Sequence, residues 1–226
     1  MPRTVLQVDT SARFSESISR PLTRKLSNGL ALDASRLIRR DLAKSPPSPI
    51  TEAWMESAAL PERDRTARQQ DALLESDTLI AELELACTLV IGLPVYNFGP
   101  PSVFKAWIDQ IARAGRTFDY IDGRSVGLVR NKAAYILATS ASDRGADVQG
   151  AIDFAYRALA FLGIENVLTI SAEGVGALLD IENQIDAIIA RPKSPQSLAS
   201  GAGGPRTLAG ARSDPLALDH GQNAIR

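Results

Sequence analysis

Short apolar runs rich in β-branched residues alternate with longer segments of helical period along most of the chain. Such alternation is typical of repeated strand–helix–strand units, which build a parallel sheet covered by helices on both faces. The runs predict five strands, at residues 4–8, 35–40, 88–93, 133–139 and 166–171. Helical periodicity predicts five helices, at about residues 17–30, 64–85, 102–114, 148–162 and 181–190. The pattern therefore favours a three-layer α/β fold with a five-stranded parallel sheet.

Two stretches fall outside this alternation. Residues 43–63 contain four prolines and a Trp54-Met55 pair, and we interpret them as an ordered excursion over the surface. From residue 193 the chain is rich in Ser, Gly, Ala and Pro without any period, a composition that buries too little apolar area to order itself. Because 226 residues suit a single α/β domain, we expect one domain over residues 1–192 and a disordered tail over 193–226.

The charges are balanced and interspersed. The chain has 25 Lys and Arg against 26 Asp and Glu, a formal net charge of -1. No basic stripe could neutralise a phosphate backbone, so nucleic acid is not an expected partner. The densest basic run, residues 36–40, falls in a predicted strand, where a solvated sheet edge explains it. No apolar run reaches signal-peptide or membrane-spanning length, so we expect a cytoplasmic protein that has no membrane partner.

The chain contains one cysteine, Cys87, and one histidine, His220. Cys87 stands in an apolar run with no second cysteine for a disulfide, so we interpret it as a small core residue. A Ser-His-Asp triad and a multi-histidine metal site both lack the histidines they need. We therefore expect no metal site and no hydrolytic triad.

A hydroxyl-rich loop, residues 9–19, follows the first predicted strand and runs directly into a helix. Free backbone N–H groups and the helix dipole attract an anion at such a point, and Ser11, Ser15 and Ser17 add hydroxyl donors. The dinucleotide fingerprint G-x-G-x-x-G and the Walker lysine loop are both absent, which favours a monophosphate. The alternative is that Ser15 or Ser17 only caps the helix.

The third predicted strand ends in an exposed turn, Tyr96-Asn97-Phe98, followed by prolines and a helix. In an open doubly wound sheet, ligands bind outside the carboxyl ends of the strands where the strand order reverses. The loop of residues 9–19 and this turn would then face one crevice, which would take a phosphate at one side and an aromatic ring at the other. A plain surface β-turn is the alternative.

The segment Pro94 to Asp109 resembles the most recognisable motif of the FMN-dependent NADH azoreductase and NADH:quinone oxidoreductase family. Segments 68–83, 113–120 and 127–132 are also similar to that family, and the resemblance covers about residues 5–189. It implies a flavodoxin-like fold with strand order 2-1-3-4-5. It also implies one FMN per subunit, a homodimer, and NADH as electron donor, with NADPH also open.

Carried over onto this sequence, the resemblance implies which residues contact the cofactor. Ser11, Ser15, Glu16 and Ser17 would bind the FMN phosphate, and the segment Val95, Tyr96, Asn97 and Phe98 would hold the isoalloxazine ring. Tyr120 and Phe161 would line the substrate pocket. No catalytic side chain is implied, because the flavin N5 carries the hydride.

A third cofactor segment departs from the family pattern, which has a Ser/Thr-Arg-Gly-Gly turn after the fourth strand. This chain reads Thr139 to Gly145 as TSASDRG. Either Ser140, Ala141, Ser142 and Asp143 take that place directly, or Asp143-Arg144-Gly145 does so after a small insertion. Glu16 also replaces a more usual neutral amide and puts a carboxylate near the phosphate.

The resemblance implies a two-electron, ping-pong reduction of quinones and reductive cleavage of azo bonds. The helix after the ring turn supports a dimer, because its apolar surface is wider than one sheet face requires, with Phe104 or Trp107 as the expected anchors. Two alternatives share the fold: an electron-carrier flavodoxin, and a flavin-free hydrolase or regulatory domain. A carrier generally shows a strongly acidic face, which a net charge of -1 does not suggest.

Overall fold

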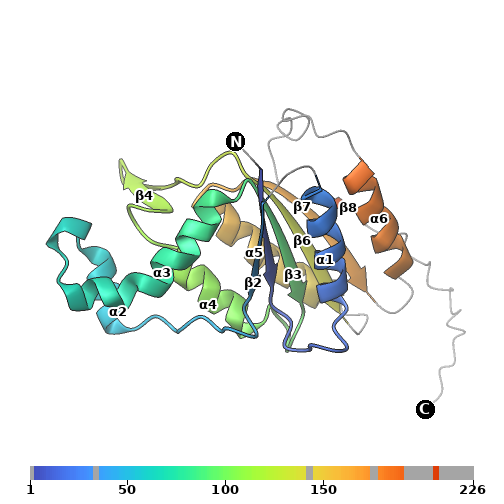
Figure 1. Ribbon diagram of the computed structural model, residues 1–226, viewed down its shortest axis with the longest axis horizontal. Helices are drawn as coiled ribbons and strands as arrows, with labels where there is room; N and C mark the ends of the chain where they lie inside the picture. The colour runs from blue at the N-terminus through green and yellow to red at the C-terminus, as the bar shows by residue number, and fades with distance from the viewer. Residues whose placement is uncertain (1–2, 33–35, 141–144, 174–177, 191–205, 209–226) are drawn as a thin grey trace, which may run out of the picture.

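The computed structural model describes residues 3–32, 36–140, 145–173, 178–190 and 206–208 (Figure 1). Its main sheet is parallel, with strand order β2-β1-β3-β6-β7-β8. These strands are β1 Thr4–Asp9, β2 Arg36–Asp41, β3 Thr88–Pro94, β6 Ala133–Ser140, β7 Asn166–Glu173 and β8 Arg206–Leu208. The helices are α1 Ser19–Leu30, α2 Glu52–Ala59, α3 Ala67–Leu85, α4 Ser102–Ile111, α5 Gly145–Leu162 and α6 Leu178–Ala190, with a short 3₁₀ turn, Glu62–Asp64.

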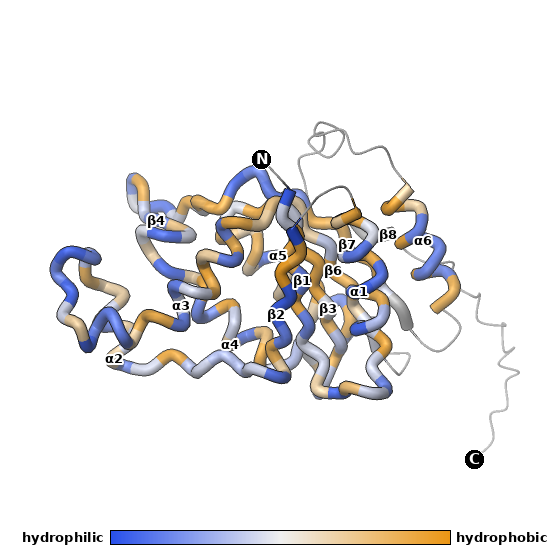
Figure 2. The backbone as a smooth tube through the Cα atoms, viewed as in Figure 1, coloured by the Kyte–Doolittle hydropathy of each residue, from blue (hydrophilic) through white to orange (hydrophobic). Residues whose placement is uncertain are grey.

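Helices cover both faces of the sheet. Alternate residues of each strand point to opposite faces, so neighbouring apolar residues such as Leu6 and Val5 enter different cores. Leu6 belongs to the core under α3, α4 and α5, and Val5 to the core under α1 and α6. The central strands therefore appear as an apolar band through the middle of the molecule (Figure 2).

The five predicted strands are confirmed, and they lie in the predicted flavodoxin-like order. The five predicted helices are also present, with ends that shift by a few residues. The basic run at residues 36–40 lies in β2, which is the edge strand beside β1. β8 is an addition within the predicted tail, where it pairs in parallel with β7. The rest of residues 193–226 lies outside the described residues, so the expected disorder there stays a prediction.

Two further elements were not predicted. α2 forms within the proline-rich excursion: the Thr51 side chain caps its first turn, and buried Trp54 donates from Nε1 to Gln110 Oε1 at 3.0 Å. The second is an antiparallel hairpin of β4 Phe118–Ile121 and β5 Arg124–Gly127. Its turn is Asp122-Gly123, with φ of 51° and 74°. This dipeptide is a strong hairpin signal because both turn positions require positive φ.

The structure corrects the sequence argument for a dimer through α4. Phe104 and Trp107 are 0% and 1% exposed within the single chain. Their rings pack together with centroids 5.9 Å apart, and Phe154 of α5 meets Phe104 edge-on at 6.1 Å. The sheet, α3 and α5 bury the wide apolar surface of α4 between them. Neither aromatic residue is available as an anchor for a second subunit.

Among the helices that the structure describes, none combines the length and apolar character needed to cross a membrane.

Candidate functional site

The loop after β1 and the turn after β3 meet at the carboxyl ends of two neighbouring strands. β1 and β3 pair in parallel up to Asp9 opposite Gly92. The Tyr96 hydroxyl lies 3.1 Å from Ser11 Oγ and accepts a hydrogen bond from the Ala12 N–H at 3.2 Å. Thr10 Oγ1 donates to the Gly92 carbonyl at 2.7 Å. The structure thus brings together the two segments that the sequence assigned to a phosphate and a ring.

The loop before α1 presents unpaired donors. The backbone N–H groups of residues 14–18 donate no hydrogen bond to any residue that the structure describes. They precede the first turn of α1, where the helix dipole is positive. A cavity of about 380 Å³ opens beside them, and its lining includes Ser15 and Ser17. Free N–H groups, hydroxyls and a helix dipole are the donor set that a phosphate monoester requires, so the residues present fit one.

The helix-cap alternative is partly right. Ser17, one residue before the N-cap position Ile18, accepts a hydrogen bond from the Arg20 N–H at 3.3 Å, so its hydroxyl satisfies one N–H of the first turn of α1. Its remaining neighbour is Ser19 Oγ at 3.3 Å, with which it can act as donor or acceptor. Ser15 and Glu16 are exposed, and the structure gives neither side chain a partner among the described residues. Capping by Ser17 and anion binding at the same loop are compatible.

Arg20 fixes the loop before α1 through hydrogen bonds to its backbone, a role that the sequence did not indicate. Its guanidinium makes a two-pronged pair with Asp41 of β2, at 2.6 and 2.9 Å. It also donates to the carbonyl oxygens of Ser11 at 2.7 Å and Arg13 at 3.0 Å. The hydrogen bond to Asp41 raises the pKa of Arg20. Burial alone would raise the pKa of Asp41, but hydrogen bonds from Arg20 and from the Lys44 and Ala43 N–H groups lower it below its usual value.

This pair should make part of the stability depend on acid pH. A carboxyl group whose pKa is lower in the folded chain than in the unfolded chain stabilises the fold. This stabilisation is complete above the pKa of the unfolded chain, about 3.9, and it is lost as the pH falls through the pKa of the folded chain. We expect Asp41→Asn to reduce the unfolding free energy at about pH 7 and to have a much smaller effect near pH 3. Urea unfolding of both proteins at the two pH values measures this, and an equal loss at both would contradict it.

The ring turn is tight and strained. Tyr96 and Gly99 exchange two backbone hydrogen bonds, of 2.9 and 3.1 Å, across Asn97 and Phe98. Those two residues have φ of 44° and 72°. Asn tolerates this left-handed region, whereas a bulky aromatic residue seldom adopts it, and such strain collects at functional sites. The Phe98 side chain is 73% exposed, so the turn presents an aromatic side chain at the surface.

The third cofactor segment is only partly described. The Val95 N–H donates to the Thr139 carbonyl at 2.9 Å, which ties the ring turn to the end of β6. Ser140 is buried at that end, next to the turn. Ala141, Ser142 and Asp143 lie outside the described residues, so the two alternative alignments of this loop both remain predictions.

Tyr120 and Phe161 lie far from this crevice in the same chain. The Phe118 ring joins them into one aromatic cluster, with centroids 5.7 Å from Tyr120 and 4.6 Å from Phe161. Phe161 stands at the end of α5, just before β7 begins, and Tyr120 stands on β4. The cluster is therefore at the amino ends of the strands, whereas Ser11 and Asn97 follow carboxyl ends (Figure 1). One chain does not bring the predicted substrate residues to the predicted cofactor residues.

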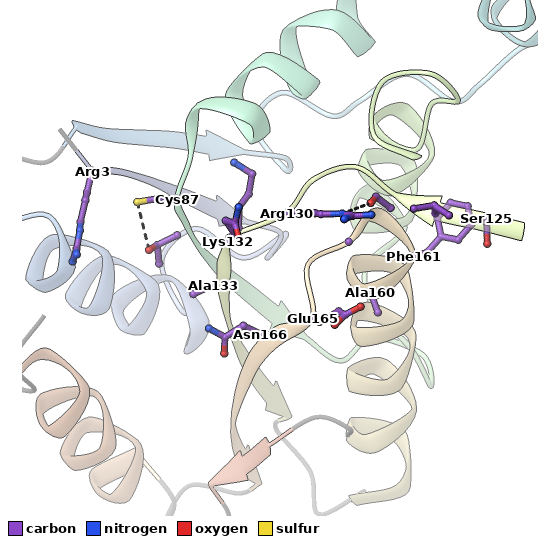
Figure 3. Close-up of a pocket in the computed structure, with 15 residues that line it drawn as sticks. Arg3, Cys87, Ser125, Arg130, Lys132, Ala133, Ala160, Phe161, Glu165 and Asn166 are labelled. Carbon is purple, nitrogen blue, oxygen red and sulfur yellow. Dashed lines mark hydrogen bonds between the residues drawn. The ribbon is translucent and has the colours of Figure 1, made fainter. Parts of the chain in front are cut away.

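A cavity of about 1100 Å³ also lies at the amino ends of the strands (Figure 3). Of the predicted site residues it contains only Phe161. Two of the cations that line it bind backbone carbonyls of the chain: the Lys132 ammonium donates to the Glu84 and Ala86 carbonyls at the end of α3, and Arg130 donates to the Gly127 carbonyl. Burial lowers the pKa of Lys132. We therefore place the candidate site at the Ser11–Tyr96 junction rather than in this larger cavity.

Cys87 lines the same larger cavity and is only half-buried, not fully in the core as expected. Its thiol lies 3.3 Å from the Thr4 carbonyl oxygen.

Comparison with known proteins identifies the family. Residues 3–193 match the family described as having the flavodoxin-like fold. The FMN-dependent NADH:quinone oxidoreductase 1 of Jannaschia sp. strain CCS1 is 40% identical over 192 residues, which cover 82% of this chain and 98% of that protein. The protein of the same name from Colwellia psychrerythraea strain 34H is 41% identical over 174 residues, covering 76% and 90%.

A solved structure agrees on the fold. The crystal structure of an FMN-dependent NADH-azoreductase from Bacillus anthracis strain Ames Ancestor in complex with FMN matches with a TM-score of 0.73 and 20% identity. The match covers 84% of this chain and 99% of that one. The chain therefore belongs to the flavodoxin-like fold family and, within it, to the family of FMN-dependent NADH:quinone oxidoreductases.

Proposed function

We propose that this chain is an FMN-dependent NAD(P)H:quinone oxidoreductase that also cleaves azo bonds. The observation that carries the proposal is the contact between Ser11 and Tyr96, which joins a loop of free N–H donors to an exposed aromatic turn at the point where the strand order reverses. Relatives about 40% identical over most of their length bear the names of such enzymes.

The residues present divide into a phosphate end and a ring end. The N–H groups of residues 14–18, with the hydroxyls of Ser11, Ser15 and Ser17, would hold the phosphate of FMN. Glu16 is exposed, so its carboxylate can turn into solvent, away from the anion. Val95, Tyr96, Asn97 and Phe98 would hold the ring, and Asn97 can both donate to and accept from its polar edge.

FMN, when bound, would accept a hydride and then pass on its two electrons. The chain contributes binding and orientation. A carboxyl-end crevice that leaves one ring face open would admit NADH and then the quinone or azo compound, each in its turn. Because the two substrates need the same space, they would react by a ping-pong scheme. NADH is the donor named for the relatives, and a cytoplasmic location would supply it.

Titration of the purified chain with FMN, followed by steady-state kinetics with NADH and a benzoquinone, tests this function. We expect one FMN bound per chain with its visible absorbance, and parallel double-reciprocal lines. An azo dye should lose its colour with NADH under the same conditions. Reduction of a redox protein without NADH oxidation would instead indicate an electron carrier, and failure to bind FMN would indicate a flavin-free protein.

We also propose that the working unit is a homodimer in which Tyr120 and Phe161 complete the partner's cofactor crevice. Within one chain these residues stand at the opposite ends of the strands from Asn97, so they can line the same pocket only across a subunit contact. Tyr120 is 65% exposed on the projecting hairpin and is free to make such a contact.

Mixing two inactive variants tests the shared site. One variant carries Ser11→Ala with Asn97→Ala, and the other carries Tyr120→Ala with Phe161→Ala. In a mixed dimer, one site receives both intact halves and the other receives neither, so quinone reduction should return on mixing and subunit exchange. Activity that stays absent, while scattering shows mixed dimers, would place both halves of the site in one chain.

A further inference from the structure

We propose that Arg20, anchored by Asp41, is a positioning residue that fixes the phosphate loop so that its N–H groups point at the FMN phosphate. This inference rests on the proposed function, because it concerns the same cofactor. Arg20 borders the cavity of about 380 Å³ but is only 9% exposed. Its guanidinium makes four hydrogen bonds, to Asp41 and to the Ser11 and Arg13 carbonyls, so its role is to hold the loop.

The orientation of the loop follows from the planarity of the peptide bond. In a trans peptide, the carbonyl of one residue and the N–H of the next point in opposite directions. Arg20 draws the carbonyls of Ser11 and Arg13 toward its guanidinium. The N–H groups of Ala12 and Phe14 must then point away from Arg20. The Ala12 N–H donates to the Tyr96 hydroxyl, and the Phe14 N–H has no partner among the described residues.

The same guanidinium therefore directs the first free N–H of the cradle, that of Phe14, outward. The ring turn is held separately, because Tyr96 and Gly99 exchange two backbone hydrogen bonds and the Val95 N–H donates to the Thr139 carbonyl. Ser11 Oγ supports this arrangement, because it accepts from the Arg13 N–H at 3.2 Å and contacts the Tyr96 hydroxyl.

Asp41 makes the position of Arg20 well defined. It binds the guanidinium with both carboxylate oxygens, and its Oδ1 accepts from the N–H groups of Ala43 and Lys44 at 3.1 Å each. The Phe14 ring closes over the other side, with its centroid 4.7 Å from the guanidinium carbon. A lysine could keep the charge, but its three N–H donors could not replace the four hydrogen bonds that Arg20 makes to Asp41 and to the two carbonyls.

Arg20 and Asp41 neutralise each other, so Arg20 contributes to phosphate recognition through the backbone dipoles that it orients rather than through its own charge. Loss of Arg20 should therefore weaken recognition of the phosphate group without altering recognition of the ring.

The test compares FMN with riboflavin, which has the same ring but no phosphate, by fluorescence titration. We expect Arg20→Lys and Asp41→Asn each to raise the Kd of FMN by about tenfold or more, and to leave the Kd of riboflavin within about twofold. Arg40→Lys is the matched control. Arg40 sits next to Asp41 on β2 and makes a two-pronged pair with Glu82, away from the loop. It should change neither Kd.

Each other outcome overturns the inference. An unchanged FMN Kd in both variants would mean that the loop holds its shape without Arg20. An equal rise for FMN and riboflavin would mean that the pair supports the fold in general. A wild-type chain that binds neither ligand would overturn the proposed function itself. If Arg20→Lys does not fold, Asp41→Asn decides the matter, since it keeps the guanidinium and removes only its anchor.

Discussion

Gly127→Ala is expected to destabilise the chain by about 3 kcal/mol or more, a large effect for one methyl group. A Cβ at Gly127 would lie 2.2 Å from the Gly163 nitrogen and 2.4 Å from the Leu162 carbonyl carbon. Both are backbone atoms, so no side chain can rotate away. The end of β5 must then separate from the end of α5, and the hydrogen bond from the Val129 N–H to the Leu162 carbonyl, 2.9 Å long, would be strained or lost.

Gly150→Ala is the matched control for this substitution. Gly150 lies within α5, and nothing lies within 4 Å of a Cβ built there. Because alanine favours a helix interior over glycine, this variant should gain roughly 0.5–1 kcal/mol. Urea unfolding of both variants measures the two effects. Similar midpoints for the two variants would show that the hairpin and α5 can separate at little cost.

The Gly127 variant also bears on function, because the hairpin carries Tyr120. Displacement of β5 should disturb the contacts of Phe118 with Tyr120 and Phe161 and leave the Ser11–Tyr96 junction intact. We therefore expect KM for the quinone to rise while FMN affinity stays near the wild-type value. A fall in FMN affinity at equal folded fraction would mean that the hairpin region also supports cofactor binding.

The fold could be predicted because each strand and helix carries a local signal. Buried parallel strands appear as β-branched runs such as residues 88–93, and amphipathic helices appear through their period. The hairpin was also within reach, since Asp122-Gly123 joins two β-prone segments. β8 carries no such signal: its Arg206–Leu208 segment is short, and pairing with β7 is a tertiary contact.

The types of residue in the candidate site could be predicted, but the contacts between them could not. The serines before α1 and the Tyr96-Asn97-Phe98 turn stand out in the sequence. Their junction does not, because Ser11 and Tyr96 are 85 residues apart and only the sheet order makes them neighbours. The role of Arg20 could not be predicted either, since an arginine in a first helical turn usually faces solvent. Its partner Asp41 lies on β2, 21 residues further along the chain.

Periodicity failed for α4 for a different reason. The width of an apolar face shows how much surface a helix must bury, but not how many neighbours bury it. Phe104 and Trp107 suggested a second subunit, whereas α3, α5 and the sheet of the same chain cover them. The argument for the proposed dimer therefore rests on the separation of Tyr120 and Phe161 from Asn97, and α4 gives it no support.

Trp107→Ala distinguishes a role of α4 in the core of one chain from a role in a subunit contact. Deletion of a buried tryptophan side chain should cost about 3–5 kcal/mol, since the Phe104 ring loses its stacking partner and a cavity opens between α4 and the sheet. Leu74→Ala, at a position of α3 that is 59% exposed, is the control and should stay within about 0.5 kcal/mol.

The two measurements are urea unfolding and light scattering across a dilution series. If Trp107 is core, its variant loses stability, while the folded fraction shows the same mass at each dilution as the wild-type protein. The milder Trp107→Phe variant, which keeps most of the ring volume, serves if the alanine variant does not fold. A Trp107 variant of near wild-type unfolding free energy that dissociates on dilution would instead make the residue a subunit anchor and reverse the assignment made from its burial.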